Sequence, residues 1–254
     1  MDRQKFSAIG HGDHDYCNPL SAGKIERVLD LLPLNAKSQA LDLGCGRGEL
    51  SLRLIERFKS RVVAVDRSAA MLDAARERAR RRGVLDRLEL IDADIATHAP
   101  PADAFDLTAM LGGGGIADGI AGICARLKSW TRPGGHVLIA EGFWARAPSP
   151  EYLAVLGGTE DEFRDHRGNV QAGIDAGLIP MYATVSSTEE WDDYEWKYDR
   201  SIERYAREQP NDPDVPAMLE RIRRWRDGYL RWGRDTLGFA AYLFYRPHAD
   251  QAWA

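Results

Sequence analysis

The amino-acid sequence predicts an α/β fold in which helices pack on a mostly parallel sheet, and two observations carry this prediction. From residue 22 to about residue 145, short apolar runs alternate with helical patterns, as expected of successive strand–helix units. The first apolar run also leads through a glycine-rich turn into a helical segment, and such turns bind ligands at the carboxyl ends of parallel strands. We therefore expect a ligand-binding α/β sheet.

The strands are apolar runs bounded by glycine, proline or charged residues. Between the second and third runs, Ser68 is a candidate N-cap and Gly83 a candidate stop of a helix over residues 68–82. Its arginine cluster lies on the polar side and near the C-terminal end, so we expect a solvated face and not a nucleic-acid patch. In the first part of the chain we expect strands at residues 39–43, 61–65, 88–92, 105–110 and 136–140.

The composition changes after Glu141, and residues 186–235 are rich in charge and tryptophan. Helical patterns there are separated by a turn at residues 210–213 and flanked by strand-like runs at 182–186 and 238–245. We expect a helical lid inserted before an antiparallel last strand. The resulting division is an N-terminal cap (1–24), a cofactor-binding core (25–145), a substrate and lid region (146–235), and the last core strand with a tail (236–254).

The overall composition of the chain limits the classes of partner that it is expected to bind. The chain has 254 residues, 44% of them apolar, and 34 basic and 39 acidic residues intermixed for a net charge of −5. This balance gives no electrostatic footprint for nucleic acid or anionic lipid. No signal peptide or membrane span is visible, and three widely spaced cysteines indicate neither a disulfide framework nor a zinc site. We expect a cytoplasmic protein with a small-molecule partner, whose oligomeric state no motif encodes.

The glycine turn is the densest chemical signal. Gly44, Gly46 and Gly48 follow Asp42 in a G-x-G-x-G pattern, and Glu49 stands where a dinucleotide-binding turn carries its third glycine. A carboxylate there would repel a pyrophosphate. S-adenosylmethionine, with a sulfonium and no phosphate, suits the turn better, and Asp42 is a candidate for its methionine end. A tight packing turn without a ligand is the alternative.

Acidic residues end the next two strands. Asp66 can accept hydrogen bonds from both ribose hydroxyls, a feature that dinucleotide folds share. Asp94 can accept from the adenine amino group, with Ile95 packed on one face of the ring. Met71 can cover the other face, although an ordinary helix-core role is equally compatible with its position. Leu111, at the end of the fourth strand, completes the predicted cofactor set.

Together these motifs resemble those of class I S-adenosylmethionine-dependent methyltransferases. The resemblance covers roughly residues 25–141 and includes Arg132-Pro133-Gly134-Gly135 before the fifth strand. It implies a Rossmann-like sheet, S-adenosylmethionine as cofactor, and cofactor roles for Asp42, Gly44, Gly46, Gly48, Asp66 and Asp94. Both ends of the chain are similar to a poorly characterised bacterial group of small-molecule methyltransferases. The run Gly112–Gly115 departs from the usual bulkier residues and predicts an open or mobile pocket wall.

The sequence indicates the catalytic and acceptor-binding residues less specifically than the cofactor-binding residues. Methyl transfer is an in-line displacement, so positioning can supply most of the rate and a base is not required. If a base acts, His14 and His11 are the candidates, with a hydrogen-bonded capping loop as the alternative. Glu141, expected to end strand five, can bind an amine or hydroxyl or form a strand-end salt bridge. The candidates for an aromatic wall are Tyr16, Trp144, Trp191 and Tyr194, and burial as ordinary core residues is the favoured alternative for aromatic side chains on amphipathic helices. No metal site is expected.

Two other function classes remain open at this point. One is a non-catalytic cofactor-binding or interaction protein, which the coincidence of several cofactor motifs with a lid disfavours. The other is a nicotinamide-dependent oxidoreductase, which Glu49 disfavours. Binding of the cofactor without product formation would distinguish the first from a methyltransferase.

Overall fold

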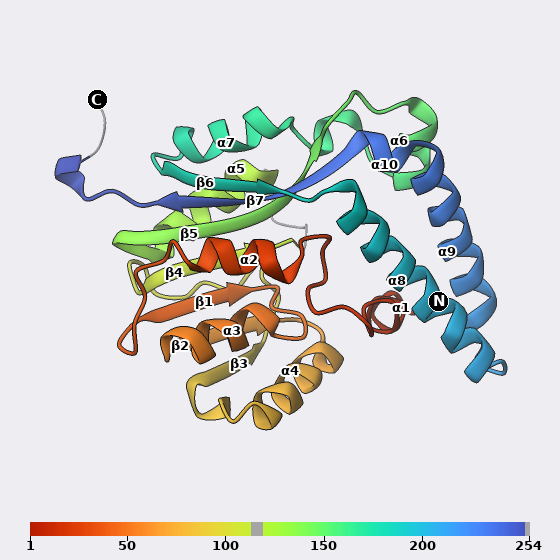
Figure 1. The fold of residues 1–254 in the computed structure, drawn as a ribbon, viewed down its shortest axis with the longest axis horizontal. Coiled ribbons are helices and arrows are strands. Elements are labelled where there is room, and N and C mark those ends of the chain that lie inside the picture. The colour runs from red at the N-terminus through yellow and green to blue at the C-terminus, as the bar shows by residue number, and fades with distance from the viewer. Residues whose placement is uncertain (113–118, 252–254) are drawn as a thin grey trace.

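The computed structural model describes residues 1–112 and 119–251, which form one seven-stranded sheet with helices on both faces (Figure 1). The strand order is β3-β2-β1-β4-β5-β7-β6, and only β7 runs antiparallel to its neighbours. This confirms the predicted Rossmann-like sheet with an antiparallel last strand. The strands are β1 Gln39–Leu43, β2 Arg61–Asp66, β3 Leu88–Asp92, β4 Phe105–Leu111, β5 Thr131–Trp144, β6 Ile179–Val185 and β7 Leu237–Tyr245.

The helices fall into two layers and a lid (Figure 1). Helices α2, α3 and α4 cover one face of the sheet, α5 and α7 cover the other, and α8 and α9 extend past the carboxyl ends of the parallel strands with α1 against α8. Their bounds are α1 Arg3–Gly10, α2 Ala22–Leu29, α3 Glu49–Phe58, α4 Ala69–Arg81, α5 Gly119–Trp130, α6 Pro150–Leu156, α7 His166–Asp175, α8 Thr188–Glu208, α9 Val215–Gly228 and α10 Arg234–Thr236.

Strand alternation produces two cores, one on each face of the sheet. In β5, Val137 and Ile139 pack toward α5 and α7, whereas Leu138 and Ala140 pack toward α2 and α3. Successive side chains of a strand point to opposite faces, so one apolar run serves both layers. The continuous apolar character of these runs therefore reflects burial on both sides.

The lid interrupts the chain between β6 and β7, as predicted. Helix α8 begins with a capping box, in which Ser187 accepts from the Glu190 amide and the Glu190 side chain accepts from the Ser187 amide. A small third core joins the lid to α1. Its fully packed members are Phe6, Ile202, Met218 and Ile222.

Two expectations about local structure are corrected. Strand β5 does not end at Glu141 but continues to Trp144, because its far end pairs with β7 through Trp144 and Leu237. The arginines of α4 are not all solvated, because Arg78 and Arg82 turn inward onto the buried carboxylate of Glu49. Ser68 is the N-cap of α4 as predicted, although its side chain makes no capping hydrogen bond. Helices α1, α6 and α7 were not anticipated from the sequence.

Among the described residues, none of the helices combines the length and apolar character needed to cross a membrane.

Candidate functional site

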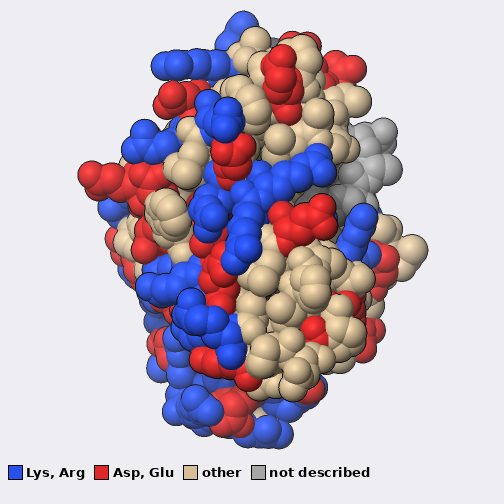
Figure 2. Space-filling view, turned by 90° about the vertical axis from the view of Figure 1, so that its right-hand side faces the viewer, with Lys and Arg blue, Asp and Glu red and all other residues tan. Residues whose placement is uncertain are grey.

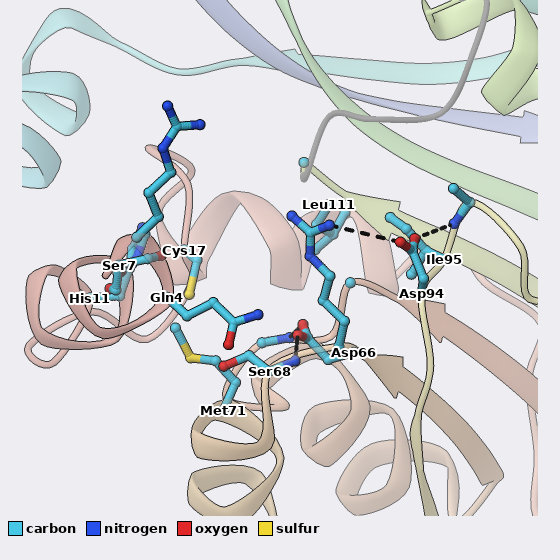
Figure 3. Close-up of a pocket in the computed structure, with 16 residues that line it drawn as sticks. Gln4, Ser7, His11, Cys17, Asp66, Ser68, Met71, Asp94, Ile95 and Leu111 are labelled. Carbon is cyan, nitrogen blue, oxygen red and sulfur yellow. Dashed lines mark hydrogen bonds and ion pairs between the residues drawn. The ribbon is translucent and has the colours of Figure 1, made fainter. Parts of the chain in front are cut away.

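A cavity of about 410 Å³ lies at the carboxyl ends of β1, β2 and β4, and we call it the sheet-edge cavity. Figure 3 shows Gln4, Ser7 and His11 on one side of it and Asp94 and Ile95 on the other. The cavity is also lined by five residues that the sequence predicts to bind the cofactor, namely Gly44, Gly46, Asp66, Met71 and Leu111. The location matches the ligand site expected of an open α/β sheet.

The glycine turn shapes one wall of this cavity. Gly46 has a φ of 52°, in the left-handed region that favours glycine, and its amide points to the Asp66 carboxylate. Gly48 does not line the cavity. It caps α3 with a φ of 77°, and a Cβ there would lie 3.0 Å from Cβ of Ala75. Gly48 therefore allows α3 and α4 to approach closely, whereas Gly44 and Gly46 are available to a ligand.

Asp66 connects two elements of the site. Its Oδ2 accepts a hydrogen bond from the Gly46 amide and its Oδ1 accepts one from the Ser68 amide, each at 2.9 Å. Each carboxylate oxygen has further acceptor capacity. Asp66 therefore fixes the glycine turn against the start of α4 and still presents two acceptors to the cavity.

Asp42 and Glu49 lie elsewhere. Asp42 is buried beneath the turn, where its Oδ2 accepts a 2.6 Å hydrogen bond from Ser51 and burial raises its pKa to about 7. Glu49 is buried between α3 and α4, with oxygens within 2.5–2.8 Å of Arg53, Arg78 and Arg82. Contrary to expectation, Glu49 does not repel a pyrophosphate at this site, because its carboxylate is paired with arginines and does not line the cavity.

The far end of the cavity is formed by the loop after β3. Asp94 accepts from the Ala96 amide at 2.8 Å and faces Arg67 across 3.8 Å. Ile95 lines the same end, and Met71 of α4 contributes a thioether to the opposite wall. An acceptor oxygen with apolar groups around it suits a flat, amino-bearing heterocycle.

The N-terminal segment closes the near end. Arg47 of the glycine turn donates to the carbonyl oxygens of His11, at 3.0 Å, and Gly12. Further along, Asn18 Nδ2 donates to the Leu111 carbonyl oxygen at 3.0 Å. These bonds hold residues 11–18 across the ends of β1 and β4, so the cavity depends on a segment remote in sequence.

The two predicted histidines differ in their access to the cavity. His11 lines it: Nδ1 lies 2.8 Å from the Ser7 carbonyl oxygen, which requires a proton on Nδ1, and Nε2 lies 3.0 Å from Tyr194 Oη, so it accepts the phenolic hydrogen. Burial lowers the pKa of His11 to about 4. His14 is buried outside the cavity lining, and its Nε2 donates to the Tyr194 carbonyl oxygen at 2.9 Å. Both imidazoles are neutral near pH 7.

The remaining candidates do not line the sheet-edge cavity. The Tyr194 hydroxyl donates to His11, and the Trp191 ring packs against the Tyr194 ring with centroids 6.1 Å apart. Tyr16 belongs to the core under α2 and α3. Trp144 Nε1 donates to the Glu160 carbonyl oxygen at 2.7 Å, and Glu141, whose pKa burial raises, accepts from the Gly142 amide. Gly113, Gly114 and Gly115 lie outside the described residues.

Sequence reasoning missed several lining residues. Gln4 and Ser7 come from α1, whose only early signal is the Asp2 N-cap, which accepts from the Gln4 and Lys5 amides. Cys17 and Arg67 also line the cavity without belonging to a recognisable motif. Their position depends on tertiary contacts.

The Arg47 tether gives a first testable prediction. Replacing Arg47 with Ala removes charge-assisted hydrogen bonds worth about 1.5–3 kcal/mol each, so amide hydrogen exchange over residues 11–14 should accelerate at least about tenfold. Arg57→Ala, near the end of the following helix α3 and paired with Glu26 and Asp30, is the matched control. Equal exchange in the two variants would show that the tether does not hold this segment.

Comparison with known proteins agrees with this architecture. A family model described as "Methyltransferase domain" matches residues 40–135. The Escherichia coli protein YjhP is 26% identical over 95% of this chain and 98% of its own, and its crystal structure superposes with a TM-score of 0.87 over 95% of this chain and 99% of that one. The trans-aconitate 2-methyltransferase of Paracidovorax citrulli is 40% identical over 44% of this chain and 42% of its own length.

A further solved structure extends the likeness in fold. The S-adenosylmethionine-dependent methyltransferase of Thiobacillus denitrificans, solved with S-adenosylhomocysteine, is 23% identical and has a TM-score of 0.87 over 97% of this chain and all of that one. The domain match spans β1 through the start of β5, which includes the glycine turn, Asp66 and Asp94. The chain is a class I S-adenosylmethionine-dependent methyltransferase that resembles YjhP.

Proposed function

We propose that this methyltransferase acts on a small-molecule acceptor that enters between the sheet edge and the lid. The observation that carries the proposal is the sheet-edge cavity, which runs from the strand ends to α1 beneath the N-terminal segment. Its size lies within the range of about 300–1,000 Å³ typical of small-ligand pockets. A pocket of this size suits a small acceptor better than a macromolecule.

The surface around the lid supports the same proposal. Figure 2 shows the end of the molecule that carries the lid, where basic side chains lie beside acidic ones. Arg204 pairs with Asp13, Arg226 with Asp199, and Arg234 with Asp192. Because these three arginines are paired with carboxylates, they are less available to a nucleic-acid backbone than free cations would be.

The cavity residues fit S-adenosylmethionine by their chemistry. The cofactor supplies an electrophilic methyl group on a sulfonium. In our proposal Asp66 accepts from the ribose hydroxyls, Asp94 accepts from the adenine amino group between Met71 and Ile95, and the Gly44–Gly46 backbone lies against the methionine moiety. Leu111 then borders the methyl group. Asp42 and Gly48 act indirectly, since neither lines the cavity.

On the acceptor side, His11 is a positioning residue in this proposal. Its Nδ1 proton is directed at the Ser7 carbonyl oxygen and its Nε2 lone pair at Tyr194, so neither nitrogen is free to take a proton from the acceptor. The His14 ring lies behind the His11 ring, with centroids 5.4 Å apart, whereas Glu141 and Trp144 do not line the cavity and have no assigned role. The rate enhancement then rests on holding the acceptor atom in line with the methyl group.

Calorimetry tests the cofactor assignment and product formation tests the acceptor class. We expect S-adenosylhomocysteine to bind and NAD not to bind. With S-adenosylmethionine as donor, release of S-adenosylhomocysteine should depend on an added amine, acid or alcohol of low molecular weight. Methyl transfer only to a protein or nucleic acid would contradict the proposed acceptor class. Binding without any transfer would favour a non-catalytic role.

A further inference from the structure

A second cavity lies inside the lid and has no role in the cofactor site. This lid cavity, of about 220 Å³, lies between α1, α8 and α9 and shares one wall residue, His11, with the sheet-edge cavity. Its lining residues are Phe6, His11, Tyr194, Glu195, Tyr198, Arg221, Ile222 and Trp225. His11 therefore borders both cavities.

The Glu195 carboxylate is the unusual feature of this wall. The residue is 8% exposed, and its Oε2 accepts a 2.7 Å hydrogen bond from Trp225 Nε1. Arg226, the cation nearby on α9, is engaged by both oxygens of Asp199. Within the described part of the chain, no ion pair reaches Glu195. A buried carboxylate without a cation is unfavourable unless it is protonated or a ligand completes it.

The surrounding rings are suited to a cation. Phe6, Tyr194, Tyr198 and Trp225 contribute aromatic surface to the same small cavity, and aromatic faces attract ammonium groups, more strongly when water is excluded. Arg221 is the one basic side chain among the lining residues of this cavity. It is exposed, and its guanidinium lies over the Phe6 ring at 5.5 Å. Solvent screens its charge more than that of Glu195.

We propose that the lid cavity binds an ammonium group of the acceptor, with Glu195 as its counter-ion and the aromatic side chains around it. This inference rests on the proposed function, because it names the chemical class of the acceptor as an amine-bearing small molecule. It concerns recognition, whichever acceptor atom receives the methyl group. A cavity of about 220 Å³ is below the drug-sized range, so it suits one end of a small acceptor whose other end lies in the sheet-edge cavity.

Binding of three matched probes to the protein saturated with S-adenosylhomocysteine tests this inference. The probes are 2-phenylethylammonium, 2-phenylethanol and 3-phenylpropionate, titrated by calorimetry at about pH 8, where the amine is protonated and Glu195 is ionised. We expect the ammonium probe to bind at least about tenfold more tightly than either of the others. Equal affinities, tighter binding of the propionate, or no binding of the ammonium would overturn the proposal.

Single-residue variants test whether the ammonium probe binds at Glu195. Glu195→Gln keeps an acceptor for Trp225 and should abolish the preference for the ammonium probe, while S-adenosylhomocysteine affinity reports that the variant is folded. Asp193→Asn removes an exposed carboxylate from the same helix, paired with Lys197, and should change nothing. Arg221→Gln should leave ammonium binding unchanged or stronger. An unaltered preference in Glu195→Gln would exclude Glu195 as the counter-ion.

Turnover separates this inference from the proposed function. Methyl transfer only to acids or alcohols, unaffected by Glu195→Gln, would leave the small-molecule function standing and reject the amine. Glu195-dependent binding of the ammonium probe, together with no transfer to any small molecule, would reject the function and retain the cavity's specificity.

Discussion

Replacing Asp66 with Ala should weaken S-adenosylhomocysteine binding about a hundredfold, which corresponds to about 3 kcal/mol. The reason is twofold. The carboxylate is the proposed partner of the ribose hydroxyls, and it also holds the Gly46 and Ser68 amides that shape the cavity wall. Loss of the side chain therefore removes ligand contacts and loosens the turn that makes other contacts. Calorimetry on the folded variant measures the effect.

Two controls identify the cause. Asp66→Asn keeps one acceptor oxygen and should lose about tenfold. Asp92 lies opposite Asp66 in the β2–β3 register, is exposed and does not line the sheet-edge cavity, so Asp92→Ala should bind normally. Wild-type affinity in Asp66→Ala would remove this residue from the proposed cofactor site, and equal losses at Asp66 and Asp92 would indicate a general charge effect.

Replacing Glu195 with Gln should stabilise the protein in a pH-dependent manner. Burial raises the pKa of Glu195 from 4.5 to about 7 in the folded protein. Between these values the unfolded chain has released its proton while the folded protein still holds it, so wild-type stability falls as the pH rises. Gln stays neutral and avoids this loss. Its advantage should grow from about 1 kcal/mol near pH 5 to about 3 kcal/mol near pH 8.

Urea unfolding of both proteins without ligand across this range measures the difference. Asp42, whose pKa burial also raises, contributes equally to the two proteins and cancels. Asp193→Asn, which removes an exposed carboxylate paired with Lys197 on the same helix, controls for the loss of a charge. A difference for Glu195→Gln that does not change with pH would mean that the buried carboxyl keeps an ordinary pKa, and a decrease with pH would indicate a counter-ion that the structure does not show.

The sheet was predictable because its strands are short apolar runs between turn residues. Each of the first four observed strands lies within one residue of its predicted bounds. The extension of β5 to Trp144 was not predictable, because the pairing partner, Leu237, lies far along the chain. Helix α1 was not predicted from the sequence for a related reason. Eight residues form a marginal helix by themselves, and this one depends on Phe6 packing against Ile202 and Met218.

The residues of the site differ in the same way: some follow from local sequence patterns and others only from tertiary packing. Strand ends and a glycine turn are local patterns, and the residues they indicate include five that line the sheet-edge cavity, Gly44, Gly46, Asp66, Asp94 and Leu111. Asp42 belongs to the same motif, but its contact with Ser51 beneath the turn follows from the packing of α3 on β1. Glu195 has charged neighbours on a helical pattern and resembles any solvated acid until α1 and α9 enclose it.

The lid is attached to the sheet through two strands that pair with each other. Its helices leave the sheet after β6 and return at β7, and these two strands pair directly, with Val185 opposite Ala240 and the Ser186 amide donating to the Phe239 carbonyl oxygen. Both attachment points are thus fixed by backbone bonds that do not depend on what lies between them. The length and sequence of the insert can therefore change without breaking the pairing of β6 with β7, which is local to the ends of these two strands.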